Sequence, residues 1–199
     1  MDVLFEFDID KAVAATVYIA TRDPKPMELT QAKLFKMLYL ADRDHLVRFG
    51  RPIIGDVYHA MAHGPVPSKL YSAFKELKKT SMFRSSDARV LAKSVTLDKS
   101  WTHPRIEAQA EVDPLQLSDS DIRSLDRIVQ QFGQMNFSQV RRIAHDTLAY
   151  ENAWTHKPED KDAAPMKFED FFEDDGNALS GVKEEMIENH ALKTVFARR

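Results

Sequence analysis

Residues 30–48 constrain the fold more than any other segment, because they carry an unusually broad apolar arc at helical spacing. The segment reads TQAKLFKMLYLADRDHLVR, and the arc comprises Leu34, Met37, Leu38, Leu40, Ala41 and His45. Thr30 is a suitable N-cap, and Gly50 is a suitable stop signal just past the end. We therefore predict a helix over 30–48 that is buried on much of its circumference.

Other segments with apolar periodicity and suitable boundary residues predict further helices. Asp8, Ser118 and Asn136 can act as N-caps, and Pro67 suits the first position of a helix. Ser118 and Asp121 together resemble a capping box with Asp in place of Glu. The helices predicted in this way cover residues 8–21, 67–79, 118–132, 136–148 and 180–196.

Strand signals are fewer and shorter. Residues 105–112 alternate strictly between apolar and polar side chains, which is typical of a strand with one wet face. Residues 90–97 are a candidate partner for that strand, and residues 57–62 are a candidate short strand between turn signals. The predicted fold class is α+β, mainly α, with five or six helices around a small antiparallel β-sheet.

The C-terminal part of the chain changes character after residue 156. Residues 156–177 are acidic, contain proline and are poor in β-branched residues, so we predict an irregular or weakly helical linker. The expected organisation is a domain over 1–156, followed over 157–199 by the acidic linker and a C-terminal helix or tether.

Two groups of apolar residues in this tail are candidate partner contacts. Phe168, Phe171 and Phe172 lie among acidic residues, and either fold back onto the core or anchor an exposed docking segment. Val195 and Phe196 belong to a final stretch that mixes apolar and basic residues, which fits a terminal helix or a peptide tether.

Composition and motifs exclude several chemistries. The chain has no cysteine, so disulfides, thiolate metal sites and a cysteine nucleophile are excluded. No P-loop, GxGxxG, HExxH or GxSxG sequence is present, and His59 and His63 lack an obvious third metal ligand. We therefore predict no catalytic, cofactor-binding or metal-binding residues. Asp42, Asp44 and His45 are expected to lie on the exterior of a helix and to form local ion pairs there.

The N-terminus and the charge bear on location and partners. MDVLFEFDIDK has acids where a secretory signal has basic residues, and no apolar run approaches the roughly 20 residues needed to cross a bilayer. The expected location is the cytoplasm, without membrane attachment. The net charge of −3 gives no basic footprint for nucleic acid. Arg141, Arg142 and His145, after the turn at Gly133, keep a helix-turn-helix open as an alternative.

Three ordered blocks carry a family resemblance. They are a Lys-Leu-x-Lys-x-Leu-Tyr-x-Ala-Asp helix from Lys33 to Asp42, Gly-Arg-Pro-Ile-x-Gly-Asp at residues 50–56, and His-Gly-Pro-Val-Pro at residues 63–67. Together they resemble the SocA-like antitoxin family, also called the Panacea domain, over about residues 8–156. The residues that carry the fold motif are Lys33, Tyr39, Asp42, Gly55, Asp56, Gly64, Pro65, Pro67, Tyr71, His145 and Trp154.

The resemblance implies a bacterial or phage-associated antitoxin that neutralises a cognate protein toxin by direct contact and is not an enzyme. It also implies that some members act as adaptors that deliver the toxin to an AAA+ protease such as ClpXP. Most motif residues are expected to serve folding, and Lys33 and Asp42 are expected to pair with each other. Arg51 and His63 are the candidate contacts among them. A DNA-binding transcriptional regulator is the alternative, and an uncharacterised hydrolase is the third possibility.

Overall fold

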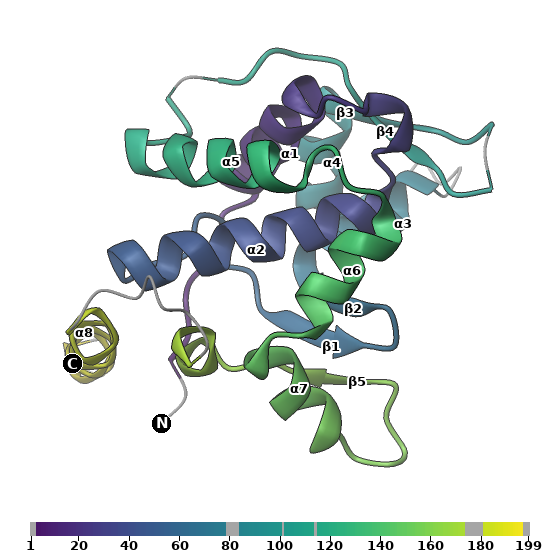
Figure 1. Ribbon diagram of the computed structural model, residues 1–199. Coiled ribbons are helices and arrows are strands. Elements are labelled where there is room, and N and C mark those ends of the chain that lie inside the picture. Colours follow the sequence, from purple (N-terminus) through teal and green to yellow (C-terminus); the bar gives the residue numbers. More distant parts are fainter. Residues whose placement is uncertain (1–2, 79–83, 101, 114, 174–180, 197–199) are drawn as a thin grey trace.

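A single buried helix, α2 (Gln31–Phe49), runs through the middle of the protein (Figure 1). The computed structural model describes residues 3–78, 84–100, 102–113, 115–173 and 181–196. Fourteen of the 19 residues of α2 are buried, which confirms the prediction made from its broad apolar arc. Thr30 accepts a hydrogen bond from the Lys33 backbone at the start of α2, and Gly50 adopts a left-handed conformation at its end.

The helices around α2 begin at the predicted caps. Asp8 caps the first helix, and Ser118 and Asn136 each form a complete capping box with the residue three positions later. Helices α1, α5 and α6 pack against α2, and α4 packs against α1 and α3. Their bounds are α1 (Ile9–Arg22), α3 (Ser68–Lys78), α4 (Ser86–Ser94), α5 (Asp119–Phe132), α6 (Phe137–His145) and α7 (Leu148–Thr155).

Two small antiparallel sheets complete the core. In the first, β1 (Tyr58–Met61) lies between β2 (Gly64–Pro67) and β5 (Ala163–Pro165), so that a tight hairpin is extended by a strand from far along the chain. In the second, β3 (Val95–Asp98) pairs with β4 (Arg105–Ala108). Figure 1 shows the hairpin and β5 beneath α2, with the second sheet on the opposite side of the molecule.

The α+β class with a helical majority is confirmed, but the number of elements was underestimated. The described residues form eight α-helices, one of which occupies positions 86–94, where a strand was predicted from Val90. Ser85 caps that helix, which leaves only residues 95–98 for the strand. The partner strand therefore ends at Ala108 rather than Val112. The predicted helix over 136–148 is also divided, because α6 ends at His145 and α7 begins at Leu148.

The irregular or weakly helical linker predicted over 156–177 is wrong for residues 163–165, which form a strand. Residues 163–165 form β5, and a 3₁₀ helix, η2 (Phe168–Phe172), follows it against α2. Phe168, Phe171 and Phe172 are buried, and the Phe171 ring lies 5.3 Å from that of Tyr39. The three phenylalanines therefore close the core, and their burial removes them from the candidate partner contacts.

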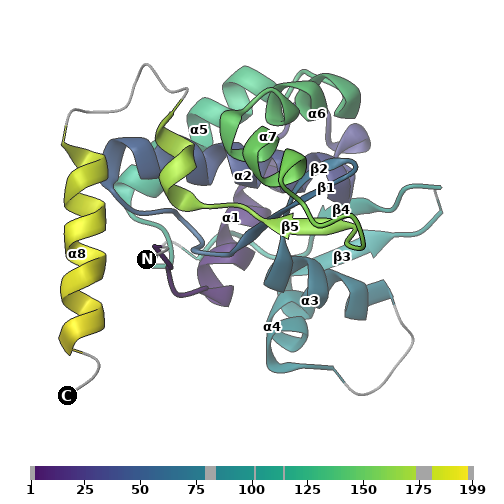
Figure 2. The ribbon, with the colours of Figure 1, turned by 90° about the horizontal axis from the view of Figure 1, so that it is seen from below.

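The last helix, α8 (Val182–Phe196), confirms the C-terminal helix predicted from the sequence and stands at the edge of the molecule (Figure 2). It contacts the end of α2, with Met186 buried and Lys183 paired with Glu173. Ile187 and Leu192 are exposed. Val195 and Phe196 lie in the last turn, where the side chains are outside the described residues. No helix in the described ranges is long and apolar enough to cross a membrane.

Gly55 is a position where only glycine fits. Its φ angle is +67°, and a Cβ atom placed there would lie 2.3 Å from the backbone oxygen of Glu6. Gly55→Ala should therefore lower the free energy of unfolding by at least about 2 kcal/mol, as measured by urea denaturation.

The matched control for this prediction is Gly181→Ala. Gly181 has a φ angle of +86°, but a Cβ atom there would meet nothing within 4 Å, so only the backbone strain applies. That strain amounts to roughly 1 kcal/mol. Equal losses in the two variants would contradict the steric argument.

Candidate functional site

Asp42 fixes the loop after α2 rather than facing solvent. Its carboxylate accepts hydrogen bonds from the backbones of Ile53 and Ile54, at 2.8 and 3.1 Å, and from the Tyr58 hydroxyl at 3.0 Å. Burial raises the pKa of Asp42 to about 7, and the three donors oppose that rise. The prediction that Asp42 lies on a helix exterior is therefore wrong, whereas Asp44 does form the expected ion pairs, with Arg48 and Arg127.

The expected pairing of Lys33 with Asp42 is also wrong. Lys33 is buried and donates from Nζ to Asp23 at 2.9 Å and to the backbone oxygen of Gly133 at 2.8 Å. Nine residues of helix separate positions 33 and 42 by roughly 13 Å, which is too far for a direct contact. Lys33 instead joins α2 to the segments that follow α1 and α5.

Asp56 organises the start of α3, although it lies 12 residues before that helix. It accepts hydrogen bonds from the Ser68 hydroxyl and from the backbones of Lys69 and Leu70. These backbone donors lack partners within the helix, so Asp56 takes the place of an N-cap. The motif residues Asp42 and Asp56 thus hold the 50–57 loop between α2 and the hairpin.

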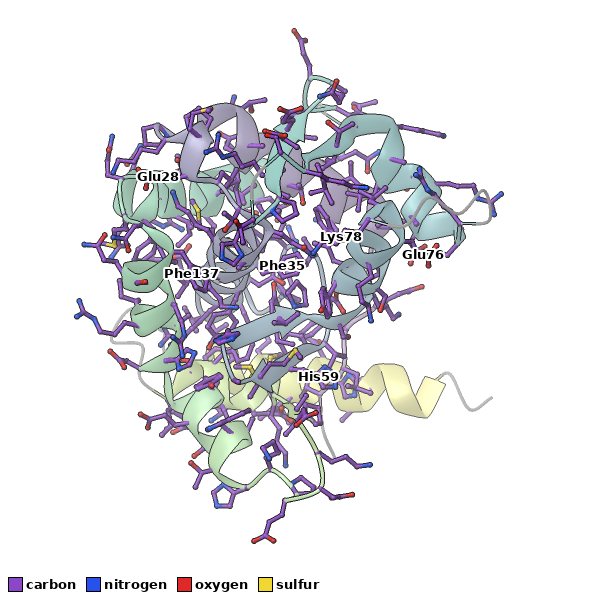
Figure 3. The ribbon with its side chains drawn as sticks, turned by 90° about the vertical axis from the view of Figure 1, so that its right-hand side faces the viewer. Glu28, Phe35, His59, Glu76, Lys78 and Phe137 are labelled. Carbon is purple, nitrogen blue, oxygen red and sulfur yellow. The ribbon has the colours of Figure 1, made fainter. Side chains whose placement is uncertain are left out.

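Beside the hairpin lies a pocket of about 630 Å³, which we call the hairpin pocket. It is bounded by the first turns of α2, the β1–β2 hairpin, α3 and the segment after α7. Figure 3 looks onto this face, where Phe35 and Lys78 lie between α6, which carries Phe137, and the part of α3 that carries Glu76. The lining residues are Gln31, Ala32, Phe35, Lys36, Met61, Ala62, His63, Val66, Tyr71, Lys78, His103, Trp154, Lys157 and Asp162.

Lys36 is the most unusual residue of the hairpin pocket. It is 1% exposed, and its Nζ donates to the backbone oxygen of Pro65 at 3.0 Å. No carboxylate in the described residues forms a salt bridge with it. Burial lowers the pKa of Lys36 to about 7, and the charge of Arg141 acts in the same direction. A buried ammonium without an anion is unfavourable, so this position is electrostatically incomplete.

Gly64 brings the hairpin into contact with both α2 and α6. Its φ angle is +98°, and a Cβ atom there would lie 2.8 Å from Lys36 Cε and 2.9 Å from His145 Cδ2. Arg141 donates to the backbone oxygen of Ala62, at the tip of the hairpin. The hairpin therefore requires glycine at this motif position, because two side chains fill the space beside it.

A row of rings connects the motif residues His145 and Trp154. The Tyr150 ring lies 4.2 Å from that of His145 and 6.1 Å from that of Trp154, and the Tyr150 hydroxyl donates to the backbone oxygen of Met61. Burial lowers the pKa of His145, Arg141 adds to that effect, and a hydrogen bond with the His63 backbone opposes it. The hairpin is thus held on one side by α6 and α7.

The chain was compared with protein families, curated proteins and solved structures. The family model for "Antitoxin SocA-like, Panacea domain" matches residues 34–155, which is more than half of the chain. This chain belongs to the SocA-like antitoxin family. Searches of the curated proteins and of the solved structures found no match.

The matched region of this SocA-like chain contains α2 from Leu34 onward, the hairpin and α3 to α7, and therefore most of the hairpin pocket. It leaves out α1, which packs on α2, and β5 and η2, which close the core beneath it. Lys33 lies one residue before the match, yet its buried ion pair is part of the same core.

The two candidate contacts of the SocA-like motif line different hollows. His63 is exposed at the tip of the hairpin and lines the hairpin pocket. Arg51 lines a second groove, of about 970 Å³, between α8 and the end of α2. There it contacts Asp121 at 3.0 Å and Ser118 at 3.2 Å, so it ties the 50–57 loop to the start of α5. The contacts of Arg51 thus indicate a structural role. The His63 side chain, in contrast, is exposed and accessible to a partner.

The two buried donors of the hairpin pocket were not predicted from the sequence. Gln31 and Lys36 were not singled out, because the contacts of a polar residue in a buried helix depend on segments that are distant in the sequence. The available signal was a lysine at position 36 within the otherwise apolar arc of α2. The helix-turn-helix alternative gains no support, since Arg141 is engaged with the hairpin. In the described residues, no three His, Asp or Glu side chains gather as metal ligands.

Removing the charge of Lys36 should stabilise the SocA-like domain in a pH-dependent way. The pKa is about 7 in the folded state against the usual 10.5, so the unfolded chain binds the extra proton between these values and wild-type stability rises with pH across that window. Lys36→Met should raise the free energy of unfolding at pH 6 by on the order of 1–4 kcal/mol. Chemical denaturation at pH 6, 8 and 10 should show this gain shrinking, and a constant difference would contradict the account.

Proposed function

We propose that this protein is an antitoxin that neutralises a cognate protein toxin by binding it directly, without catalysis. Membership of the SocA-like antitoxin family is the observation that carries the proposal. The hairpin pocket supports it, since a preformed hollow with apolar walls and a charged interior suits an anchoring side chain of a partner.

The toxin-binding surface in this proposal is centred on the hairpin pocket and the exposed His63 at its rim. A stable complex buries about 1,600 Å² in total, of which a few anchors contribute most of the affinity. The carboxylates of motif residues such as Asp42 and Asp56 accept hydrogen bonds that hold the loop and the start of α3. The rim residues are free to differ between antitoxins that bind different toxins.

Co-expression with the neighbouring reading frame tests the proposal. We expect a small adjacent gene whose product stops growth when expressed alone and permits growth when this protein is co-expressed. The toxin should co-purify with a tagged copy of this protein. A neighbouring product that is harmless alone, or one that remains toxic in the presence of this protein, would overturn the proposal.

We further propose that α8 serves delivery of the toxin to an AAA+ protease such as ClpXP. The helix extends away from the domain and exposes Ile187 and Leu192, which suits a tether. Deletion of residues 190–199 should leave toxin binding unchanged but lengthen the half-life of the toxin in growing cells. Pulse-chase labelling measures that half-life, with Lys93→Ala, an exposed position on α4, as the control variant. An unchanged half-life would leave simple occlusion as the mechanism.

A further inference from the structure

Two buried donors in the hairpin pocket have fewer partners than their chemistry requires. The Gln31 side chain is 6% exposed, and its Nε2 atom has no hydrogen-bond partner in the described part of the chain. Lys36 is 1% exposed and donates only to the Pro65 carbonyl oxygen. Both line the same pocket from the first turns of α2. Unpaired buried donors are uncommon, so a missing acceptor is the simplest account of the pair.

The charge around these donors defines that acceptor as an anion. The pocket is lined by Lys36, Lys78, Lys157, His63 and His103, and the acid among its lining residues is Asp162. Arg141 lies close enough to depress the pKa of Lys36, which adds further positive potential. An anion that meets a buried ammonium gains far more than one that meets an ammonium at the surface.

The walls indicate what carries the anion. Phe35, Val66, Tyr71 and Trp154 present apolar surface to the pocket. A volume of about 630 Å³ accommodates one or two residues of an extended chain but not a helix. An inorganic ion would leave these walls unused. The pocket therefore fits an acidic group attached to an apolar or aromatic stem.

We propose that the hairpin pocket binds the C-terminal residue of the partner chain, with its carboxylate at Lys36 and Gln31 and its apolar side chain against Phe35, Tyr71 and Trp154. The assignment of this residue to a toxin rests on the proposed function. The proposed binding of a carboxylate does not depend on that function, and small probes test it. The carboxylate accepts from Lys36 Nζ and Gln31 Nε2, and so satisfies both donors.

Proton uptake is a consequence of this arrangement. Above pH 7 the free protein increasingly holds Lys36 neutral, and a bound carboxylate restores its proton. The charged and titratable groups that act on Lys36 are Arg141 and His145 from α6, and those that line the pocket with it are His63, Lys78, His103, Lys157 and Asp162. Burial holds the pKa of His145 below its usual value, so His145 stays neutral across the window from pH 7.5 to 9, in which Lys36 loses its proton.

Calorimetric titration of the full chain with N-acetyl-L-phenylalanine tests the proposal, with N-acetyl-L-phenylalaninamide as the matched uncharged probe. We expect the acid to bind with a dissociation constant on the order of 1 mM at pH 7, and the amide to bind at least about tenfold more weakly. Affinity for the acid should fall by up to about tenfold per pH unit between pH 7.5 and 9.

Two variants separate the pocket chemistry from a general loss of structure. Lys36→Met should abolish the preference for the acid over the amide and remove the pH dependence, while the domain stays at least as stable as wild type. Gln31→Leu should weaken binding of the acid several-fold and leave that of the amide unchanged. Equal binding of both probes, no binding of either, or a pH dependence that survives Lys36→Met would overturn the proposal.

Two further experiments distinguish a chain terminus from a side chain as the source of the carboxylate. N-acetyl-glutamic acid α-amide presents a side-chain carboxylate, and tighter binding of that probe would overturn the assignment to a chain terminus. For the toxin, a two-residue Gly-Ser extension of its C-terminus should weaken the complex at least tenfold. A toxin that binds unchanged with the extension contradicts this inference alone, whereas a neighbouring product that never binds contradicts the proposed function.

Discussion

Asp42→Ala should cause one of the largest losses of stability of any single substitution in this protein, about 3–5 kcal/mol of unfolding free energy. The substitution leaves three buried donors unsatisfied, namely the backbones of Ile53 and Ile54 and the Tyr58 hydroxyl. The loop that these donors anchor joins α2 to the hairpin, so its loss should also loosen the hairpin pocket. Urea denaturation followed by circular dichroism measures the effect.

Asp42→Asn and Asp44→Ala are the controls for this prediction. Asparagine keeps an acceptor for the two backbone donors, so its loss should be less than half that of alanine. Asp44 lies two residues away and forms partly exposed pairs with Arg48 and Arg127, whose removal should cost about 1 kcal/mol. Equal losses for Asp42→Ala and Asp44→Ala would show that the hydrogen bonds of Asp42 do not stabilise the loop.

Lys33→Met should have an effect of similar size, because it leaves a charge buried without its partner. The side chains of Lys33 and Asp23 are both fully buried, with 2.9 Å between Nζ and Oδ2. Removing one partner of such a pair typically costs about 3–5 kcal/mol. The thermal midpoint of the single variant should fall accordingly, as measured by calorimetry.

The double variant Asp23→Leu with Lys33→Met distinguishes pairing from packing. With both charges removed, much of the lost stability should return, since apolar residues replace a buried ion pair at little net cost. The double-mutant cycle should therefore give a coupling energy of more than about 2 kcal/mol. Additive losses would mean that Asp23 and Lys33 stabilise the fold independently of each other.

These two sites also show where prediction from sequence succeeds and where it fails. The caps at Asp8, Thr30, Ser118 and Asn136 were predicted because each acts on a backbone within three residues. The partners of Lys33 and Asp42 were not, because they come from segments brought together only by the tertiary fold. Local periodicity identified α2 as buried, but it did not identify what each polar residue on it contacts.

The C-terminal tail illustrates a second limit. The sequence left two alternatives open for Phe168, Phe171 and Phe172, folding back onto the core or an exposed docking segment, and the structure shows the three rings buried together in a 3₁₀ helix. Glu169 accepts a hydrogen bond from the Val3 backbone, which joins the tail to the N-terminus. Burial of three rings outweighs the composition of the surrounding residues.

The hairpin pocket shows both what the sequence predicts and what depends on the tertiary fold. Its motif residues Tyr71 and Trp154 were predicted as fold determinants, and they do line its walls. Gln31 and Lys36 belong to a helix predicted to be buried. The missing partner of Gln31 Nε2 and the single acceptor of Lys36 Nζ depend on the tertiary packing around that helix. Such a site is visible only once the fold is known.

The central claim is that this SocA-like protein neutralises its toxin by direct contact. Titration of the purified product of the neighbouring toxic gene with the purified full chain tests it most directly. We expect a saturable complex of fixed stoichiometry, and loss of toxin activity in proportion to the complex formed. A toxin that stays fully active at a saturating excess of this protein, with no heat of binding, would contradict it.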